Sequence, residues 1–177
     1  QKVMPKSVSR NLILALQAVD NGPLTNCQEE ELAWLVETSS NIASVQSVES
    51  TVTLVSSQRS SVMSNLRNMA NAVKACFELA GAEVIQNDGY PAWKMNADSE
   101  LQRIAIQEYK KLFGHDPKVL GIHAGLECGL FSEKYPGIDM ISFGPTLRFV
   151  HTPDERLLIP TVQMVWDHML AILREID

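Results

Sequence analysis

The sequence predicts a mixed α/β fold made of two parts. Apolar residues recur at helical spacing in four segments, whereas β-branched and hydroxyl residues alternate between residues 42 and 58, as in a half-buried antiparallel pair. A turn cluster of sequence NDGYP, residues 87–91, separates the two parts. We therefore expect residues 1–90 to form an α+β portion and residues 91–177 to form part of an α/β layered domain.

The first part is expected to begin with a helix over residues 9–20. Its apolar side chains share one face, and the sequence Asn21-Gly22-Pro23 stops the pattern. The next segment, residues 28–38, is ambiguous, because its acidic start suits a helix whereas its end suits a strand.

A serine-rich stretch follows, with ten of the chain's fifteen serines between residues 39 and 64. Because apolar β-branched residues are interleaved with these serines, we expect strands at 42–47 and 51–58 joined by a tight turn, rather than disorder. A helix is expected at 61–80 and a short strand at 82–86. This order of elements is typical of the second half of a split β-α-β fold.

The second part is expected to hold two helices and two short apolar strands. The first helix is capped by Asp98 or Ser99 and runs to about residue 113, and the last helix covers residues 160–176. The strands are expected at 118–122 and 138–143. Polar loops follow both strands, and ligands of α/β domains sit at such carboxyl ends of strands.

The composition excludes several classes of function. The net charge of −6, without a cluster of Lys and Arg, argues against nucleic acid or an anionic membrane as the partner. No apolar run approaches the roughly 20 residues of a membrane-spanning helix. The three cysteines are widely spaced and odd in number, so a disulfide framework is not expected and a reducing, cytoplasmic compartment fits.

Residues that could carry chemistry lie in three places. His151 sits in a polar loop with carboxylates three and four residues further on, which suits a metal ligand or a surface histidine before a turn. His123 and Glu127 follow an expected strand, and Gly125 lets the backbone approach a ligand; the alternative is a glycine-rich turn with local capping. Arg59 suits a clamp on a carboxylate, or a solvated surface position. A catalytic metal needs about three protein ligands, so these residues alone define no metal centre.

Two motifs carry a resemblance to a known family. GIHAGLECGLF at 121–131, followed by YPGIDMISFGPTLRFVHTPDERL at 135–157, resembles the C-terminal signature of the aminoacyl-histidine dipeptidases, a family of zinc metallopeptidases also called Xaa-His or cytosol non-specific dipeptidases. The similarity extends upstream through residues 80–102 and 36–46.

This resemblance implies a fold and a set of roles. Residues 1–90 would be the C-terminal part of a lid and dimerisation domain, and residues 91–177 the C-terminal segment of a zinc-peptidase catalytic domain. His151 matches a zinc ligand, and Arg59 matches the lid arginine that binds the carboxylate of a dipeptide. Gly125 falls at a backbone position that contacts the substrate, and His123 and Glu127 belong to the same motif, so all three are expected to be substrate-binding.

The sequence also departs from the family pattern. The family's HxD segment and Glu-Glu pair would supply the other ligands of two zinc ions and the general base. No HxD occurs in this sequence, and Glu29-Glu30-Glu31 lies in the wrong context to be that pair. We therefore expect no catalytic residue in this chain and no activity of the chain alone. The alternatives are a non-catalytic binding or homodimerisation module derived from the lid, or a related aminoacylase or exopeptidase.

Overall fold

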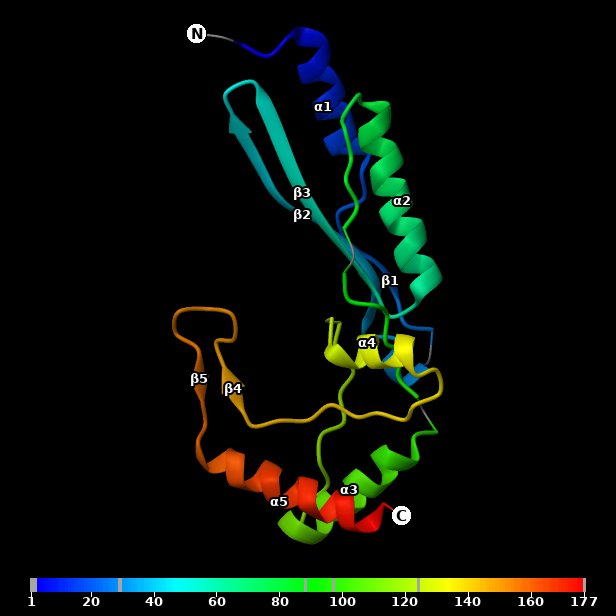
Figure 1. The fold of residues 1–177 in the computed structure, drawn as a ribbon, viewed down its shortest axis with the longest axis vertical. Coiled ribbons are helices and arrows are strands. Elements are labelled where there is room, and N and C mark those ends of the chain that lie inside the picture. The colour runs from blue at the N-terminus through cyan, green and yellow to red at the C-terminus, as the bar shows by residue number, and fades with distance from the viewer. Residues whose placement is uncertain (1–2, 29, 88, 97, 124, 177) are drawn as a thin grey trace. The chain divides into compact units, whose positions relative to one another are not determined.

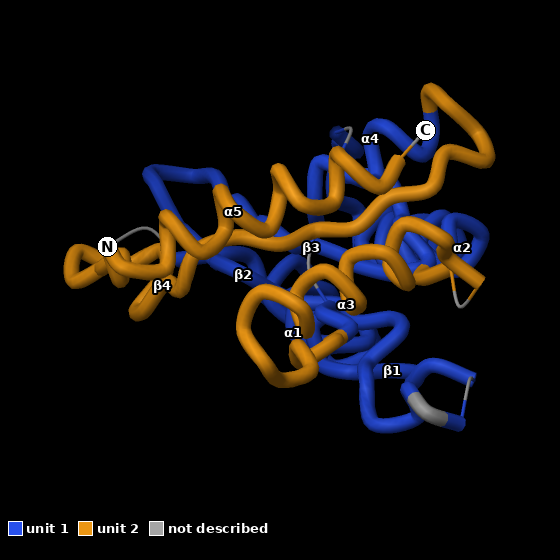
Figure 2. The backbone as a smooth tube through the Cα atoms, turned by 90° about the horizontal axis from the view of Figure 1, so that it is seen from below, with its two compact units in different colours: residues 1–94, 121–133 blue, residues 95–120, 134–177 orange. Residues whose placement is uncertain are grey.

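A computed structural model describes residues 3–28, 30–87, 89–96, 98–123 and 125–176. The chain divides into two compact units, Gln1–Lys94 with Gly121–Glu133, and Met95–Leu120 with Lys134–Asp177 (Figure 2). Helices and antiparallel strands make up both units, so the predicted mixed α/β fold is confirmed. Among the described helices, none combines the length and apolar character that crossing a membrane requires.

The first unit contains a three-stranded antiparallel sheet. Its strands are β1 (Gly22–Asn26), β2 (Val36–Val48) and β3 (Thr51–Ser60), in the order β1-β2-β3. The predicted hairpin is confirmed, with a two-residue turn in which Glu49 has φ 52°. The segment at 28–38, which suited a helix at its start and a strand at its end, contains both. A 3₁₀ turn, η1 (Glu30–Leu32), is followed by the first residues of β2.

Two helices cover one face of this sheet. In Figure 1, α1 (Lys6–Ala18) and α2 (Met63–Leu79) lie beside the hairpin. Their bounds are similar to those predicted, 9–20 and 61–80. Apolar side chains from both helices form the core, and two side chains of the hairpin pack against it. The residues concerned are Ala15, Val19, Val73 and Phe77, with Ile42 and Leu54 from the strands. The opposite face of the hairpin is open, since Val55, next to Leu54 in β3, is about half exposed.

The first helix ends before Asn21-Gly22-Pro23, as predicted. The same residues also begin the edge strand β1, which was not predicted; Pro23 is tolerated there although it lacks an N–H. One prediction for the first unit is wrong. Residues 82–86 form no strand; Val84 packs against the core instead, without a hydrogen-bonded neighbouring strand among the described residues.

The second unit is built on two helices, α3 (Glu100–Phe113) and α5 (Pro160–Glu175). Ser99 caps α3 as predicted, since its hydroxyl accepts the Gln102 N–H at 2.9 Å, and Gly114 ends the helix with φ 75°. His168 of α5 is buried, and its Nε2 lies 2.8 Å from the Ala105 carbonyl oxygen. A two-stranded ladder, β4 (Leu147–Arg148) with β5 (Arg156–Leu157), precedes α5.

The strands predicted at 118–122 and 138–143 are not formed. Within the described residues neither segment has a strand partner, and apolar side chains such as Leu120 remain exposed. Asp139 is held differently, because the Leu101 N–H at the start of α3 donates to its Oδ2 at 2.9 Å. Burial by itself raises the pKa of Asp139, but hydrogen bonds from Leu101, Ser99 and other neighbours outweigh it and lower that pKa.

Candidate functional site

A candidate ligand-binding place lies on the open face of the sheet in the first unit. Arg59 is directly opposite Ser39 in the β2–β3 ladder, and side chains of directly opposed residues share a face. The next pair, Ser40 with Gln58, points the other way, because Ser40 is only 1% exposed beneath the helices. Arg59 and Ser39 therefore point away from the helices, and Arg59 is exposed.

His123 contacts the same place from a distant part of the sequence. Its Nε2 lies 2.7 Å from the Ser39 hydroxyl, so the segment beginning at Gly121 lies against the open face beside Arg59. Burial lowers the pKa of His123, and the positive charge of Arg59 lowers it further, while a hydrogen bond with the Val36 backbone acts in the opposite direction. The lowered pKa favours the neutral ring, and Arg59 is the cation of this site.

Glycines hold this segment close to its neighbours. An added Cβ would lie 2.6 Å from Leu35 Cδ2 at Gly121 and 3.0 Å from Tyr90 Cβ at Gly125. At Gly129 it would lie only 2.3 Å from the Pro91 carbonyl oxygen. The close approach predicted for Gly125 is thus made first to Tyr90 of the same unit.

Glu127 is the first residue of α4 (Glu127–Lys134) and is exposed. An acidic side chain in the first turn of a helix is favoured by the helix dipole, so its position has a local structural reason. A role in substrate binding stays a prediction for Glu127.

His151 lies in the second unit, in the loop between β4 and β5. It is exposed and has φ 63°, and its backbone N–H donates to Glu155 Oε2 at 2.8 Å. This bond closes the loop without engaging the imidazole ring, whose nitrogens have no hydrogen bond to any of the described residues. A role as a zinc ligand stays a prediction for His151.

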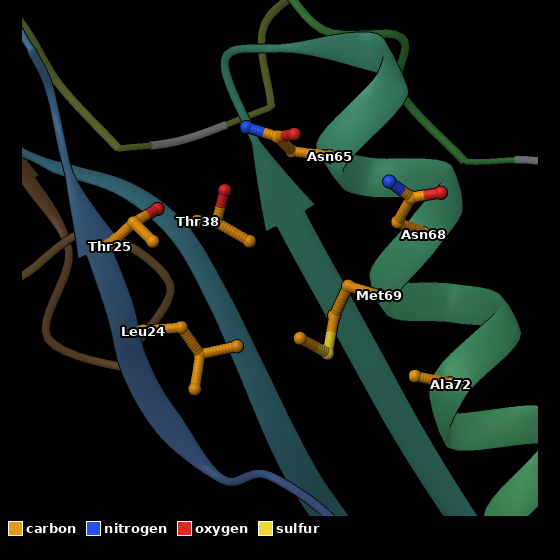
Figure 3. A pocket seen from close by; sticks show the side chains of 7 residues that line it. All are labelled: Leu24, Thr25, Thr38, Asn65, Asn68, Met69 and Ala72. Carbon is orange, nitrogen blue, oxygen red and sulfur yellow. The ribbon is translucent and has the colours of Figure 1, made fainter.

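Sequence reasoning missed a pocket of about 330 Å³ between the sheet and α2. Its lining is shown in Figure 3 and consists of Leu24, Thr25, Thr38, Asn65, Asn68, Met69 and Ala72. Behind its polar end lies the buried Glu37, whose Oε1 accepts hydrogen bonds from Asn65 Nδ2 at 2.7 Å and from both threonine hydroxyls. Thr38 faces the helices, so the pocket opens on the face of the sheet opposite to Arg59. Only the alternation of polar residues in β2 hinted at it.

Comparison with known proteins shows what this chain is similar to. No model of a known protein family matches the chain. A cytosol non-specific dipeptidase of Escherichia coli (strain K12) is 35% identical over 164 residues, which are 93% of this chain and 33% of that protein. The crystal structure of an aminoacylhistidine dipeptidase from Vibrio alginolyticus matches with a TM-score of 0.81 and 41% identity, covering 100% of this chain and 36% of that one. The chain is related to these dipeptidases.

The resemblance predicted from residues 121–157 is therefore confirmed, and the chain spans about a third of the length of both dipeptidases. Aminopeptidase PepT from Bacillus cereus ATCC 10987 matches with a TM-score of 0.74 over 94% of this chain and 44% of that one. At 18% identity, this second match shows the fold alone.

The residues described here do not fit a zinc centre by themselves. Over the described part of the chain, no three His, Cys, Asp or Glu side chains come together as a metal site would require. His151 could offer one ligand of such a site.

Proposed function

We propose that the chain is a substrate-binding portion of a metal-dependent dipeptidase that acts on Xaa-His and other dipeptides. The observation that supports it most is that Arg59 and His123 lie together on one open face of the sheet, in a chain 41% identical to an aminoacylhistidine dipeptidase. A guanidinium binds a carboxylate through two parallel hydrogen bonds, which suits the free end of a dipeptide.

Each predicted residue takes a role in this proposal. Arg59 binds the substrate carboxylate, and His123, Gly125 and Glu127 lie along the peptide. His151 supplies one zinc ligand, and the remaining ligands come from outside the described residues. The part at 1–90 belongs to the lid and the part at 91–177 to the catalytic domain. A cytoplasmic location fits the relative that is named a cytosol dipeptidase.

The proposal predicts binding without hydrolysis for the 177-residue chain. The purified chain, with its mass checked, is incubated with Xaa-His dipeptides, acyl amino acids and tripeptides with and without zinc, and we expect no cleavage. Weak binding of the free dipeptide is expected, detected by NMR, and Arg59→Met should abolish the preference for a free carboxylate over an amide. Cleavage by the chain alone, or binding that ignores Arg59, would contradict the proposal.

A homodimer is part of the same proposal. Among the described strands β3 pairs only with β2, so its outer edge is available to a second chain. Light scattering after gel filtration should give twice the 19.7 kDa mass of the chain. A monomeric mass at all protein concentrations would contradict the proposal that the outer edge of β3 pairs with a second chain.

A further inference from the structure

We propose that His123 is a positioning residue for Arg59: by bonding Ser39, it holds its own backbone on the open face so that this backbone and Arg59 bind one carboxylate-ended ligand. This inference rests on the proposed function and adds to it the means by which the site is assembled. Three observations carry it, namely the register of the strands, the hydrogen bond and the packing of the glycines.

The register places the bonded groups side by side. Ser39 and Arg59 are directly opposed in neighbouring antiparallel strands, where Cβ atoms of such pairs lie about 4.5–5.5 Å apart. His123 Nε2 is 2.7 Å from the Ser39 hydroxyl, so the ring occupies the position next to the Arg59 side chain. A ring in that position limits the directions that a long arginine side chain can take, which reduces the entropy lost when it binds.

The segment that carries His123 is clamped from both sides. Gly121 packs against the end of the Leu35 side chain and Gly125 packs against Tyr90, and an added Cβ at either position would make a tight contact. Between these two contacts, His123 links the segment to β2 through the Ser39 hydroxyl and the Val36 backbone. Of these two links, the bond to Ser39 is the one directly opposite Arg59, so its loss would leave the ring less fixed beside Arg59.

A different reading of the Ser39–His123 pair is a nucleophile with its base, since the distance suits one. Two features oppose this reading. Ser39 lies within the β1–β2–β3 ladder, paired on both sides, rather than on an exposed turn. No carboxylate is seen to orient the ring, whose described partners are Ser39 and the Val36 backbone. Positioning is therefore the role that the geometry supports.

The test uses the full ¹⁵N-labelled 177-residue chain and two probes, alanyl-histidine and its C-terminal amide. NMR titration gives the ratio of the two dissociation constants, which we expect to favour the free carboxylate about tenfold, as charge-assisted hydrogen bonds do. Ser39→Ala and His123→Leu should each reduce this preference at least fivefold. Ser39→Thr keeps the hydroxyl and should restore it, which a general loss of folding would not allow.

A matched control and a double-mutant cycle isolate the positioning role. Ser57→Ala removes a serine from the same open face, two residues before Arg59, and should leave the preference unchanged. In the Arg59→Met background, His123→Leu should have no further effect on the preference, because the two residues act on the same carboxylate.

The outcomes separate the two proposals. If the wild-type chain shows no preference for the free carboxylate, the proposed function fails and this inference fails with it. If the wild type prefers the carboxylate and Ser39→Ala does so equally, the inference alone is overturned. Labelling of Ser39 by a fluorophosphonate would also overturn it, in favour of a nucleophile.

Discussion

Gly129 tests how tightly the glycine-rich segment is packed. A Cβ added at this position would lie 2.3 Å from the Pro91 carbonyl oxygen, whereas real contacts of this kind are not closer than 3.0 Å. In the Gly129→Ala variant, α4 and the backbone of residue 91 must therefore move apart by about 0.7 Å. The obstructing atom belongs to the backbone, so a rotamer change cannot relieve the contact.

The magnitude follows from two opposing effects. Overpacking of this kind costs about 1–3 kcal/mol. Alanine in a helix is favoured over glycine by up to about 1 kcal/mol. We expect a net loss of about 1–2 kcal/mol in the first unit, which corresponds to a roughly five- to thirtyfold rise in the population of locally open states.

Hydrogen–deuterium exchange measured by mass spectrometry can detect this change. Peptides covering α4 should exchange faster in Gly129→Ala, while peptides of α3 and α5 in the second unit should not change. Gly121→Ala should have a smaller effect, since its obstacle is the end of the Leu35 side chain, which can move. Gly144→Ala meets no atom within 4 Å and is the matched control. Unchanged or slower exchange in α4 of Gly129→Ala would refute the packing described for this segment.

Three further predictions concern caps and titrating groups. Ser99→Ala should lower the free energy of unfolding by about 1 kcal/mol, and Gly114→Ala by about 1–2 kcal/mol because of its left-handed backbone, both measured by urea denaturation. The ring of His123, followed by NMR, should titrate below the ordinary histidine pKa, and Arg59→Met should move it upward; since the folded state holds the proton less well, stability should fall as the pH drops from about 6.5 through the lowered pKa. The pKa of Asp139 is also lowered, so its contribution is present above the ordinary aspartate pKa and is lost as the pH falls through the lowered value; Asp139→Asn should remove that part of the acid sensitivity. Acid unfolding curves that coincide for Asp139→Asn and wild type, or a His123 pKa at or above the ordinary value, would contradict these assignments.

Local signals in the sequence predicted the helices and the hairpin well. Ser99 and Gly114 mark the ends of α3 with residue types that only a few backbone positions favour, and the alternating serines and valines predict the hairpin. The segments at 118–122 and 138–143 were wrongly predicted as strands because a short apolar run carries no information about whether a neighbouring strand exists. The Asp139 bond to the start of α3 replaces the expected ladder.

The candidate site was predictable residue by residue but not as an assembly. Arg59 and His123 were both identified as candidates, yet nothing in the sequence links Ser39 to a histidine 84 positions away. That link depends on the register of the β2–β3 ladder, which sets the face that each side chain takes. The pocket between the sheet and α2 was missed for the same reason. The hydrogen-bond partners of Glu37, which lies behind it, come from three separate elements.

The division of the chain into interleaved units has a consequence for folding during synthesis. The first unit is not one continuous stretch of the sequence. Residues 121–133 belong to it, but residues 95–120, which precede them, belong to the second unit. Translation proceeds from the N-terminus, so the three-stranded sheet, α1 and α2 are synthesised well before His123, which bonds Ser39 of β2. Until then the open end of the hairpin near Ser39 and the backbone around Tyr90 and Pro91 lack their final neighbours. A chain truncated after residue 94 would leave these residues exposed. The shortest N-terminal fragment that contains the whole first unit ends at residue 133.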